Sequence, residues 1–428
     1  MNVLITNIVS LNPGDAAILE GSLRLLRDAF GDKLNVTVFD KNGNAAAKYY
    51  PWAHFRRSLF VNRPRRGLLE LARRGGYAHR VLLWDSLRLR LAAKLARQGL
   101  YRLTKLVLSP DERDSLSEYL KADLVISSGG TYLVEHYEML PSVLDYEFTL
   151  ALGKPLVFFP QSLGPFEKTR YRGRLKRTFG AASLVMVRDE RSASHLRDLG
   201  VSPAHVRVYP DAAFALCSSS DLVRSAGSSL RIAISVRTWR HFSGSDPSES
   251  EARYFRMIAA GVTHLVRNHG AEVTFLSTCQ GLPEYWADDS RTAESVTALL
   301  GREVMAHVRI DKAFRQPGGL LKELTKYDAI IATRMHMAIL GICAGVPVLP
   351  IAYEFKTREL FRRLGLEEWV TDIEDGNEVA FSELVEQFVD AIATLRAHLT
   401  PQLPRMRAEL SDLSKQLREI LPSIRSLP

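Results

Sequence analysis

Short apolar runs alternate with longer amphipathic stretches along most of the chain. The first run, at residues 3–5, is followed by an Asn-Pro-Gly-Asp turn at residues 12–15 and by a helix-like segment at residues 16–30. Similar runs recur through the first half at residues 35–39, 123–127, 155–159, 184–188 and 206–209. This alternation predicts successive βα units and a parallel sheet.

A second series of apolar runs follows a serine-rich stretch, residues 217–229, whose composition is that of a linker. These runs lie at residues 231–236, 272–276, 329–332 and 347–349, and the tail from about residue 378 is charged and helical in pattern. We therefore predict an α/β fold with two Rossmann-like, doubly wound domains facing a cleft, over residues 1–222 and 230–428. Open parallel sheets bind ligands beyond the carboxyl ends of their strands, so a site is expected there.

The composition is that of a globular protein with a basic excess. Of the 428 residues, 46% are hydrophobic and 25% are charged, and the formal net charge is +9. This charge favours anionic partners without choosing among phosphorylated substrates, acidic glycans, membrane surfaces and nucleic acid.

A basic insertion at about residues 56–105 has fourteen Lys or Arg residues and only two acids, Glu70 and Asp85. Leucines interleave with these cations, which predicts amphipathic helices that either contact an anionic membrane or expose a solvated basic face.

The cysteines and the N-terminus set expectations for the compartment. Cys217, Cys279 and Cys343 are far apart and form no Cys-x-x-Cys pair, so we predict neither a disulfide framework nor a thiolate zinc site, and we expect a reducing compartment. The start of the chain lacks a basic leader, and no run approaches the ~18 to 20 apolar residues that span a bilayer. We expect a cytoplasmic protein, with contact at the inner face of the membrane left open.

Loops with small or polar residues follow several predicted strands of the first half. They contain Asn12, Gly14 and Asp15, then Gly129 and Gly130, then Gln161, Arg188 and Asp211. Glycine permits the close approach of a ligand, and the amide N–H groups at a helix start can face an anion or a sugar. Helix capping by Asp15 and plain turn geometry explain the same residue types, so both interpretations stay open for these loops.

Two cationic sites follow predicted strands of the second half. Arg237 comes directly after the first strand of this series, and a guanidinium can grip a carboxylate or phosphate with two hydrogen bonds. Arg334 and His336 stand at the start of a small-residue helix, where the helix dipole and the N–H groups favour an anion. Lys356 follows the next strand and adds a cation. An imidazole exchanges a proton near neutral pH, so His336 is a candidate acid or base.

In their order along the chain, these motifs resemble the polysaccharide pyruvyltransferase family. The motifs are Asn12-x-Gly14-Asp15, Gly129-Gly130, Gln161-x-x-Gly164-Pro165, Val187-Arg188-Asp189, Pro210-Asp211, Ser235-x-Arg237, Arg334-x-His336 and Tyr353-x-x-Lys356. No single motif is specific, but their order and spacing together are. The resemblance implies a GT-B-like fold, phosphoenolpyruvate as the donor, and a pyruvate ketal formed on two hydroxyls of one sugar. A serine pair before Gly129 and the basic insertion depart from the family pattern, and both departures concern the acceptor.

The resemblance places Arg237, Arg334 and His336 at positions that bind the donor or serve the chemistry, and we predict the other roles from the residues themselves. The donor-binding set is Arg237, Arg334 and Lys356, and the acceptor-binding set is Asn12, Gly14, Gly129, Gly130, Gln161, Arg188 and Asp211. His336 is expected to act as the acid, and Asp15 or Asp211 as the base. No metal-ligand spacing is visible, so we expect neither a metal nor a cofactor. The expected partners are phosphoenolpyruvate and a glycan or lipid-linked oligosaccharide, and no nucleic acid.

Two other functions would use the same features. A glycosyltransferase with a nucleotide-sugar donor would have the same architecture, since fold does not fix function, and its diphosphate would suit an Arg-x-His site. A non-catalytic protein that binds glycan or nucleic acid through the basic insertion would show salt-dependent binding without turnover. The sequence leaves open the sugar, the linkage, the form of the acceptor and the oligomeric state.

Overall fold

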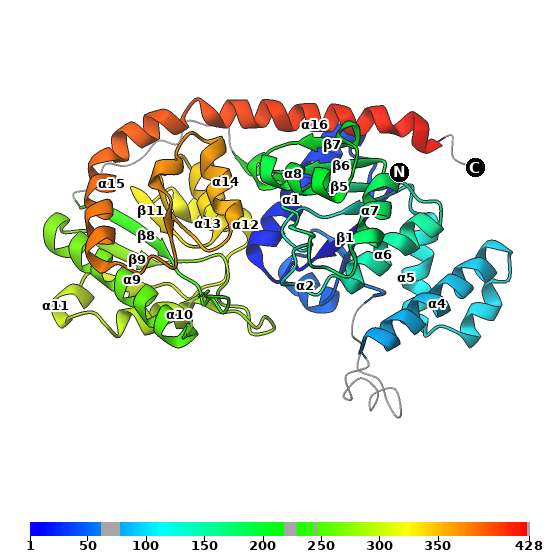
Figure 1. The fold of residues 1–428 in the computed structure, drawn as a ribbon, viewed down its shortest axis with the longest axis horizontal. Helices are drawn as coiled ribbons and strands as arrows, with labels where there is room; N and C mark the ends of the chain where they lie inside the picture. The colour runs from blue at the N-terminus through cyan, green and yellow to red at the C-terminus, as the bar shows by residue number, and fades with distance from the viewer. Residues whose placement is uncertain (61–77, 218–228, 244–245, 426–428) are drawn as a thin grey trace. The chain divides into compact units, whose positions relative to one another are not determined.

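Two parallel sheets organise the chain, one in each of two compact units (Figure 1). The computed structural model describes residues 1–60, 78–217, 229–243 and 246–425. Unit 1 comprises Met1–Ser10, Ser22–Ala212 and Leu410–Pro428, and unit 2 comprises Leu11–Gly21 and Ala213–Glu409. The turn at residues 12–15 therefore belongs to unit 2, although it follows the first strand of unit 1.

The sheet of unit 1 has the strand order β3-β2-β1-β4-β5-β6-β7, and all its neighbours pair in parallel. Its strands are β1 (Asn2–Ile8), β2 (Asn35–Asp40), β3 (His54–Arg57), β4 (Leu124–Ser127), β5 (Leu156–Gln161), β6 (Leu184–Val187) and β7 (Val206–Val208). The strands β4, β5 and β6 are buried along their full length, as expected for parallel strands that helices cover on both faces.

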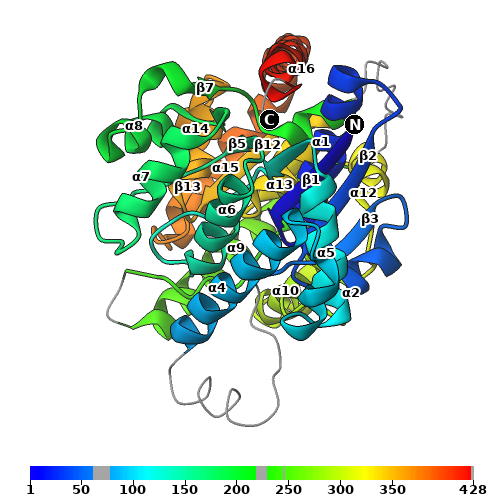
Figure 2. The same ribbon diagram turned by 90° about the vertical axis from the view of Figure 1, so that its right-hand side faces the viewer.

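Helices connect these strands. They are α1 (Pro13–Phe30), α2 (Gly43–Tyr49), α4 (Ala78–Arg97), α5 (Pro110–Lys121), α6 (Leu140–Ala151), α7 (Arg172–Ala181) and α8 (Glu190–Leu199), with 3-10 helices η2 (Tyr101–Leu106) and η3 (Pro203–His205). Helix α4 packs against α5 and α6 (Figure 2). Asp189 accepts a hydrogen bond from the backbone N–H of Ser192 and so caps α8.

Unit 2 repeats the same plan with the strand order β10-β9-β8-β11-β12-β13. Its strands are β8 (Arg231–Ser235), β9 (Glu272–Phe275), β10 (Val308–Ile310), β11 (Ala329–Ala332), β12 (Val348–Ala352) and β13 (Thr371–Asp372). Its helices are η4 (Ala212–Leu216), α9 (Pro247–His269), α10 (Asp289–Thr297), α11 (Arg302–Met305), α12 (Pro317–Leu324), α13 (Met335–Cys343), α14 (Phe355–Arg363), η5 (Glu367–Trp369) and α15 (Glu378–Leu399), and α16 (Gln402–Arg425) follows.

Both sheets have the strand order of a doubly wound Rossmann fold, so the predicted fold class is confirmed. In such a sheet the strand order reverses between the first strand and the fourth, here between β1 and β4 and between β8 and β11. The prediction missed β3, β10 and β13. These are short edge strands, and β3 and β10 carry arginines, so neither has the apolar run that marks a buried strand.

Parts of two predicted segments lie outside the described residues: residues 61–77 of the basic insertion and residues 218–228 of the serine-rich stretch. The predicted domain boundary therefore stays a prediction. Helices α4 and η2 confirm helical structure in the described part of the insertion, and α15 and α16 confirm it in the tail. Within the residues that the structure describes, no helix is long and apolar enough to cross a membrane.

A disulfide joins Cys217 to Cys343 within unit 2, with the two Cα atoms 4.5 Å apart. The expectation that the cysteines form no disulfide was therefore wrong. It relied on sequence spacing, but the fold of unit 2 brings the two cysteines together although they are 126 positions apart in the sequence. Cys279 is a buried free thiol.

The buried carboxyl of Asp145 in α6 predicts a pH-dependent stability. Burial raises its pKa to about 6, although hydrogen bonds from the hydroxyls of Thr6 and Tyr119 oppose this shift. Because the pKa is higher in the folded state than in the unfolded chain, this group stabilises the fold most below about pH 4, and the contribution falls by about 3 kcal/mol as the pH rises to about 6. We expect Asp145→Asn to remove this part of the pH dependence of the unfolding midpoint. The exposed Asp114→Asn should leave it unchanged.

Candidate active site

The carboxyl ends of four strands of unit 2 supply one group of polar side chains. Arg237 follows β8, Cys279 follows β9, Arg334 and His336 follow β11, and Tyr353 follows β12. The central pair, β8 and β11, flanks the point where the strand order reverses, which is the usual ligand position of an open α/β sheet. The predicted cationic residues are therefore brought to one edge of one sheet.

Arg237 lies over an aromatic pair. The guanidinium carbon is 4.1 Å from the ring centroid of Tyr353 and 5.2 Å from that of Trp239, and the two ring centroids are 4.6 Å apart. Its Nε donates to the carbonyl of Thr238 at 3.2 Å. Stacking on the rings holds the guanidinium plane in place while its edge can still donate hydrogen bonds. Among the described residues, Arg237 has no carboxylate within salt-bridge distance.

Two cationic side chains lie over the aromatic ring of Tyr353. Besides Arg237, the Nζ of Lys356 lies 5.1 Å from its ring centroid. Burial by itself raises the pKa of Tyr353, but the positive charges of Arg237 and Lys356 outweigh burial, so the pKa lies below its usual range. The hydroxyl is therefore more acidic than an ordinary tyrosine.

Arg334 is fixed by Asp289 of α10. Its Nε donates to Oδ2 of Asp289 at 2.9 Å and one Nη donates to Oδ1 at 2.6 Å, a bidentate pair with the carboxylate 3% exposed. Ser277, which follows β9, donates to the same carboxylate. Burial lowers the pKa of Arg334, but the charge of Asp289 outweighs this and raises it well above its ordinary value. Arg334 is thus permanently charged and rigidly placed.

Lys356 also has a carboxylate partner. Its Nζ forms an ion pair with Glu354 two residues earlier, and both side chains are about nine-tenths buried. Of the three predicted donor-binding cations, Arg334 and Lys356 are therefore already paired, whereas Arg237 stacks on aromatic rings instead. This difference makes Arg237 the cation best placed to receive an anion from solution.

His336 lies against the turn at residues 12–15. It is the second residue of α13, and Gly14 approaches it so closely that a Cβ on Gly14 would lie 2.6 Å from its Nδ1. Asn12 supports the turn: its Oδ1 accepts from the backbone N–H of Gly14 at 3.0 Å and from the thiol of Cys279 at 3.2 Å. Burial raises the pKa of that thiol to about 12, so it stays protonated. Asp15 is buried in the same turn.

The remaining predicted residues gather at the corresponding edge of unit 1. Gly130 forms a parallel bridge with Gln161, and its carbonyl accepts from the N–H of Ser162 at 2.9 Å. The Gln161 side chain is fully buried, and its Nε2 donates to Phe159 O at 3.3 Å and to Ser128 O at 3.4 Å. Its Oε1 has no hydrogen-bond partner in the described parts of the chain, and neither does the buried Oγ of Ser128.

Arg188 is held by three side chains of unit 1. Its nitrogens donate to Oγ of Ser162 at 2.7 Å, to Oδ2 of Asp211 at 2.5 Å and to Oγ1 of Thr131 at 2.6 Å. These bonds use Nε and both Nη groups of a side chain that is 6% exposed. The structure therefore brings Arg188 and Asp211 together as a buried pair that ties the ends of β4, β5, β6 and β7 to one another.

Comparison with known proteins identifies the family. The sequence pattern of the family described as polysaccharide pyruvyl transferase matches residues 12–354. The chain belongs to this family. The matched range begins at Asn12 and ends at Glu354, so it includes every predicted site residue except Lys356. The amylovoran biosynthesis protein AmsJ of Erwinia amylovora is 27% identical over 285 residues, which are 62% of this chain and 65% of AmsJ, slightly less than two thirds of that relative.

Solved structures of distant proteins share the fold of this pyruvyl transferase family member. HepE from Anabaena in complex with UDP-glucose aligns over 99% of this chain and 100% of its own, with a TM-score of 0.57 and 12% identity. UDP-GlcNAc 2-epimerase from Neisseria meningitidis, bound to UDP-GlcNAc, aligns over 99% and 100% with a TM-score of 0.57 and 11% identity. At such identity the likeness concerns the fold alone, and together with the two parallel sheets it confirms the GT-B-like class.

Sequence reasoning missed the contacts that Asp289 and Tyr353 make in this candidate site. Asp289 belongs to a pair of acids at a helix start, where capping explains both residue types. Asp288 is the cap, since its side chain accepts from the N–H of Ser290 at 3.1 Å, and this leaves Asp289 to bind Arg334. Arg334 itself could have predicted an acidic partner, because an arginine at the end of a buried strand needs a counter-charge.

Proposed function

We propose that this protein transfers the pyruvyl group of phosphoenolpyruvate to a sugar of a cell-surface polysaccharide or its precursor, forms a pyruvate ketal and releases phosphate. The observation that carries the proposal is the presence of Arg237, Arg334 and His336 together at the switch point of the unit 2 sheet. Phosphoenolpyruvate is small and has two anionic groups, a carboxylate and a phosphate, which suit two guanidinium groups and a helix N-terminus.

In the proposed reaction, His336 donates a proton to the methylene carbon of phosphoenolpyruvate and turns it into a methyl group. The adjacent carbon becomes electrophilic while Arg237 and Arg334 hold the carboxylate and the phosphate. One sugar hydroxyl adds to this carbon, and the carbon–oxygen bond to phosphate breaks with its electron pair leaving on phosphate. A neighbouring hydroxyl of the same sugar then closes the ketal. Of the two hydroxyl protons, one replaces the proton that His336 gave and the other leaves with phosphate.

The carboxylate of Asp15 is the proposed base for the attacking hydroxyl. It is buried and belongs to the residue after Gly14, where an added Cβ would come within 2.6 Å of Nδ1 of His336. A carboxylate can accept the hydroxyl proton as the oxygen attacks. Asp211, the other sequence candidate, is committed to Arg188 and is 2% exposed, so we assign it a positioning role.

We assign the acceptor to the unit 1 residues at the ends of β4 and β5. Gln161 and Ser128 each present a buried oxygen without a hydrogen-bond partner in the described residues, and such oxygens are suited to bind sugar hydroxyls. The backbone of Gly129 and Gly130 allows a sugar ring to approach closely. Asn12 and Gly14, placed in the acceptor set by the sequence, lie in unit 2 and are proposed to position His336.

The test is phosphate release from phosphoenolpyruvate with lipid-linked and polymeric glycan extracts, together with detection of pyruvate on the sugar product. We expect acceptor-dependent release that disappears in His336→Ala and persists in His205→Ala, an exposed histidine of η3. Transfer of a sugar from a nucleotide donor without incorporation of pyruvate would instead establish the glycosyltransferase alternative. Salt-dependent glycan binding with neither turnover nor phosphoenolpyruvate binding would contradict both enzymatic functions.

We also propose that α4 and η2 bring the enzyme to an anionic membrane, where lipid-linked acceptors reside. One stripe of α4 exposes Trp84, Leu87 and Leu91 at spacings of three and four residues, with 60%, 64% and 51% of each residue accessible. Cationic Arg90 and Lys94 lie exposed along the same part of the helix. Further exposed apolar residues follow in Leu100, Tyr101, Leu103 and Leu106. An apolar stripe beside cations is typical of helices that lie in a membrane interface.

The membrane proposal predicts vesicle binding that depends on this stripe. The only acid of α4, Asp85, is buried and bonded to Arg88, so it does not oppose an anionic surface. We expect sedimentation with anionic vesicles, weak sedimentation with neutral ones, and a loss of at least about tenfold in partitioning for the double variant Trp84→Ser/Leu87→Ser. The control is Trp286→Ser, which removes a tryptophan that is 76% exposed in unit 2. Equal loss in the control would contradict the proposal.

A further inference from the structure

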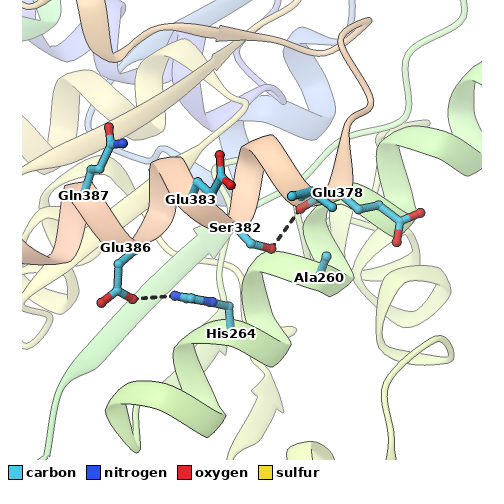
Figure 3. A pocket seen from close by; sticks show the side chains of 8 residues that line it. Ala260, His264, Glu378, Ser382, Glu383, Glu386 and Gln387 are labelled. Carbon is cyan, nitrogen blue, oxygen red and sulfur yellow. Dashed lines mark hydrogen bonds and ion pairs between the residues drawn. The ribbon is translucent and has the colours of Figure 1, made fainter.

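Two histidines of α9 and one glutamate of α15 meet where these helices pack together in unit 2. Figure 3 shows two of the three residues, His264 and Glu386. The Nε2 of His264 lies 2.5 Å from Oε2 of Glu386, and the Nε2 of His269 lies 2.7 Å from the same oxygen. The three candidate ligand atoms are all within 4.8 Å of one another. None of these residues belongs to the candidate active site or matches a motif of the family resemblance.

Close packing holds the two helices that carry these side chains. Gly261 of α9 lies against Phe381 and Val385 of α15, where an added Cβ would come within 2.7 Å of the phenylalanine ring. His264 is three residues beyond this contact on α9, and Glu386 directly follows Val385 on α15. The backbones are thus fixed relative to each other, and only side-chain rotations are needed to adjust the ligand atoms.

We propose that His264, His269 and Glu386 bind a divalent transition metal ion, Zn²⁺. Two imidazoles and one carboxylate form a known ligand set for zinc, with bonds of about 2.0–2.2 Å. Ligand atoms around a tetrahedral ion are then about 3.4 Å apart, so the carboxylate must move back from each imidazole by about 1 Å. His264 and Glu386 line an open pocket, which leaves the fourth position to water.

The surroundings favour a cation at this position. The pocket is lined by Glu378 and Glu383 as well as Glu386, and Figure 3 shows Glu386 directed at His264 from the facing helix. The amide nitrogen of Asn268, on the same helix, lies 3.3 Å from Nδ1 and 3.4 Å from Nε2 of His264.

The site differs from an ordinary histidine–glutamate pair elsewhere in the same unit. His307 and Glu272 lie 2.9 Å apart across neighbouring strands, but no second histidine joins them in the described residues. This pair therefore offers the same chemical types with one ligand fewer. It provides a matched control for a site that needs both imidazoles.

The experiment titrates the chelator-treated full-length protein with Co²⁺, whose visible absorption reports coordination by protein ligands, and then with Zn²⁺ in competition. We expect one tightly bound ion and a higher unfolding midpoint with Zn²⁺. We expect each of His264→Gln, His269→Gln and Glu386→Gln to weaken binding more than tenfold, and His307→Gln to leave it unchanged. The unfolding midpoint of each variant in chelator checks that it folds.

Three results would overturn the zinc site. They are the absence of binding to the wild type, binding that survives all three substitutions, and a thiolate-to-cobalt absorption band, which would place the ion on Cys279. The expected binding does not depend on the proposed reaction, because metal affinity is measured without phosphoenolpyruvate. Its failure would leave the transferase proposal untouched.

Discussion

Replacing Arg237 by alanine is expected to lower kcat/KM for phosphoenolpyruvate by about 10²–10³-fold, the usual loss when one charged group that stabilises a transition state is removed. Its guanidinium is stacked 4.1 Å from the Tyr353 ring centroid, and among the described residues it has no carboxylate partner. Arg334 and Lys356 are already paired with Asp289 and Glu354, so they cannot replace its charge without breaking those pairs. The measurement is steady-state kinetics at varied phosphoenolpyruvate.

The variant Arg237→Lys separates charge from shape. A lysine keeps the positive charge but cannot stack on Tyr353 or donate a planar pair of hydrogen bonds, so most of the loss should remain. The matched control is Arg240→Ala, which removes an exposed arginine from the same loop and should change kcat/KM by less than about twofold. Equal kinetics for Arg237→Ala and Arg240→Ala would remove Arg237 from the donor site.

The sequence predicts the positions of the central strands because a strand that is buried on both faces needs a continuous run of apolar residues. Strands β4, β6 and β11 are short runs of small or branched apolar residues, buried throughout, and each was expected within one residue of its observed bounds. The edge strand β3 has the sequence His-Phe-Arg-Arg, and its residues are half-buried or exposed. It therefore has no apolar run that would predict a strand. What the strand pattern predicts is therefore the buried centre of each sheet.

The positions of Arg237, Arg334 and His336 followed from the same logic. Parallel strands end at one edge, so residues that follow neighbouring strands meet there whatever their separation in sequence. The contacts that orient these side chains could not be predicted. They come from helices and turns whose positions relative to the strands do not follow from the strand pattern. Asp289 reaches Arg334 from α10, and the turn that carries Gly14 reaches His336 from the other end of the chain.

The same limit explains the wrong expectation for the cysteines, and it also hides the contacts of Arg188. Cys217 and Cys343 form a disulfide because η4 and α13 bring them together, which spacing along the chain does not reveal. Arg188 was a candidate for acceptor binding because it follows a strand, as Arg237 does. In the structure its three nitrogens bond to Ser162, Asp211 and Thr131, so it holds loops in place. Acceptor binding by Arg188 therefore stays a prediction.

Substitution of Gly14 by alanine is expected to lower kcat by about 10²-fold while phosphoenolpyruvate binding persists. The new Cβ would lie 2.6 Å from Nδ1 and 3.0 Å from Cβ of His336, so the imidazole must move by several tenths of an ångström or more. A misplacement of about 1 Å in a reacting group can cost about 10²-fold in rate. The charges of Arg237 and Arg334 stay in place, which is why KM should change much less than kcat.

A matched glycine tests whether the loss comes from His336. Gly180 in α7 has open space around a Cβ, so Gly180→Ala makes the same chemical change without a contact and should keep full activity. If Gly14→Ala strongly lowered both the unfolding midpoint and the activity, the loss of activity would come from impaired folding. The turn would then have only a structural role. If it left kcat unchanged, the position of the imidazole beside Gly14 would not matter for proton transfer. This result would contradict the assignment of His336 as the acid. A selective fall in kcat ties the N-terminal turn to the chemistry of a residue more than three hundred positions away in the sequence.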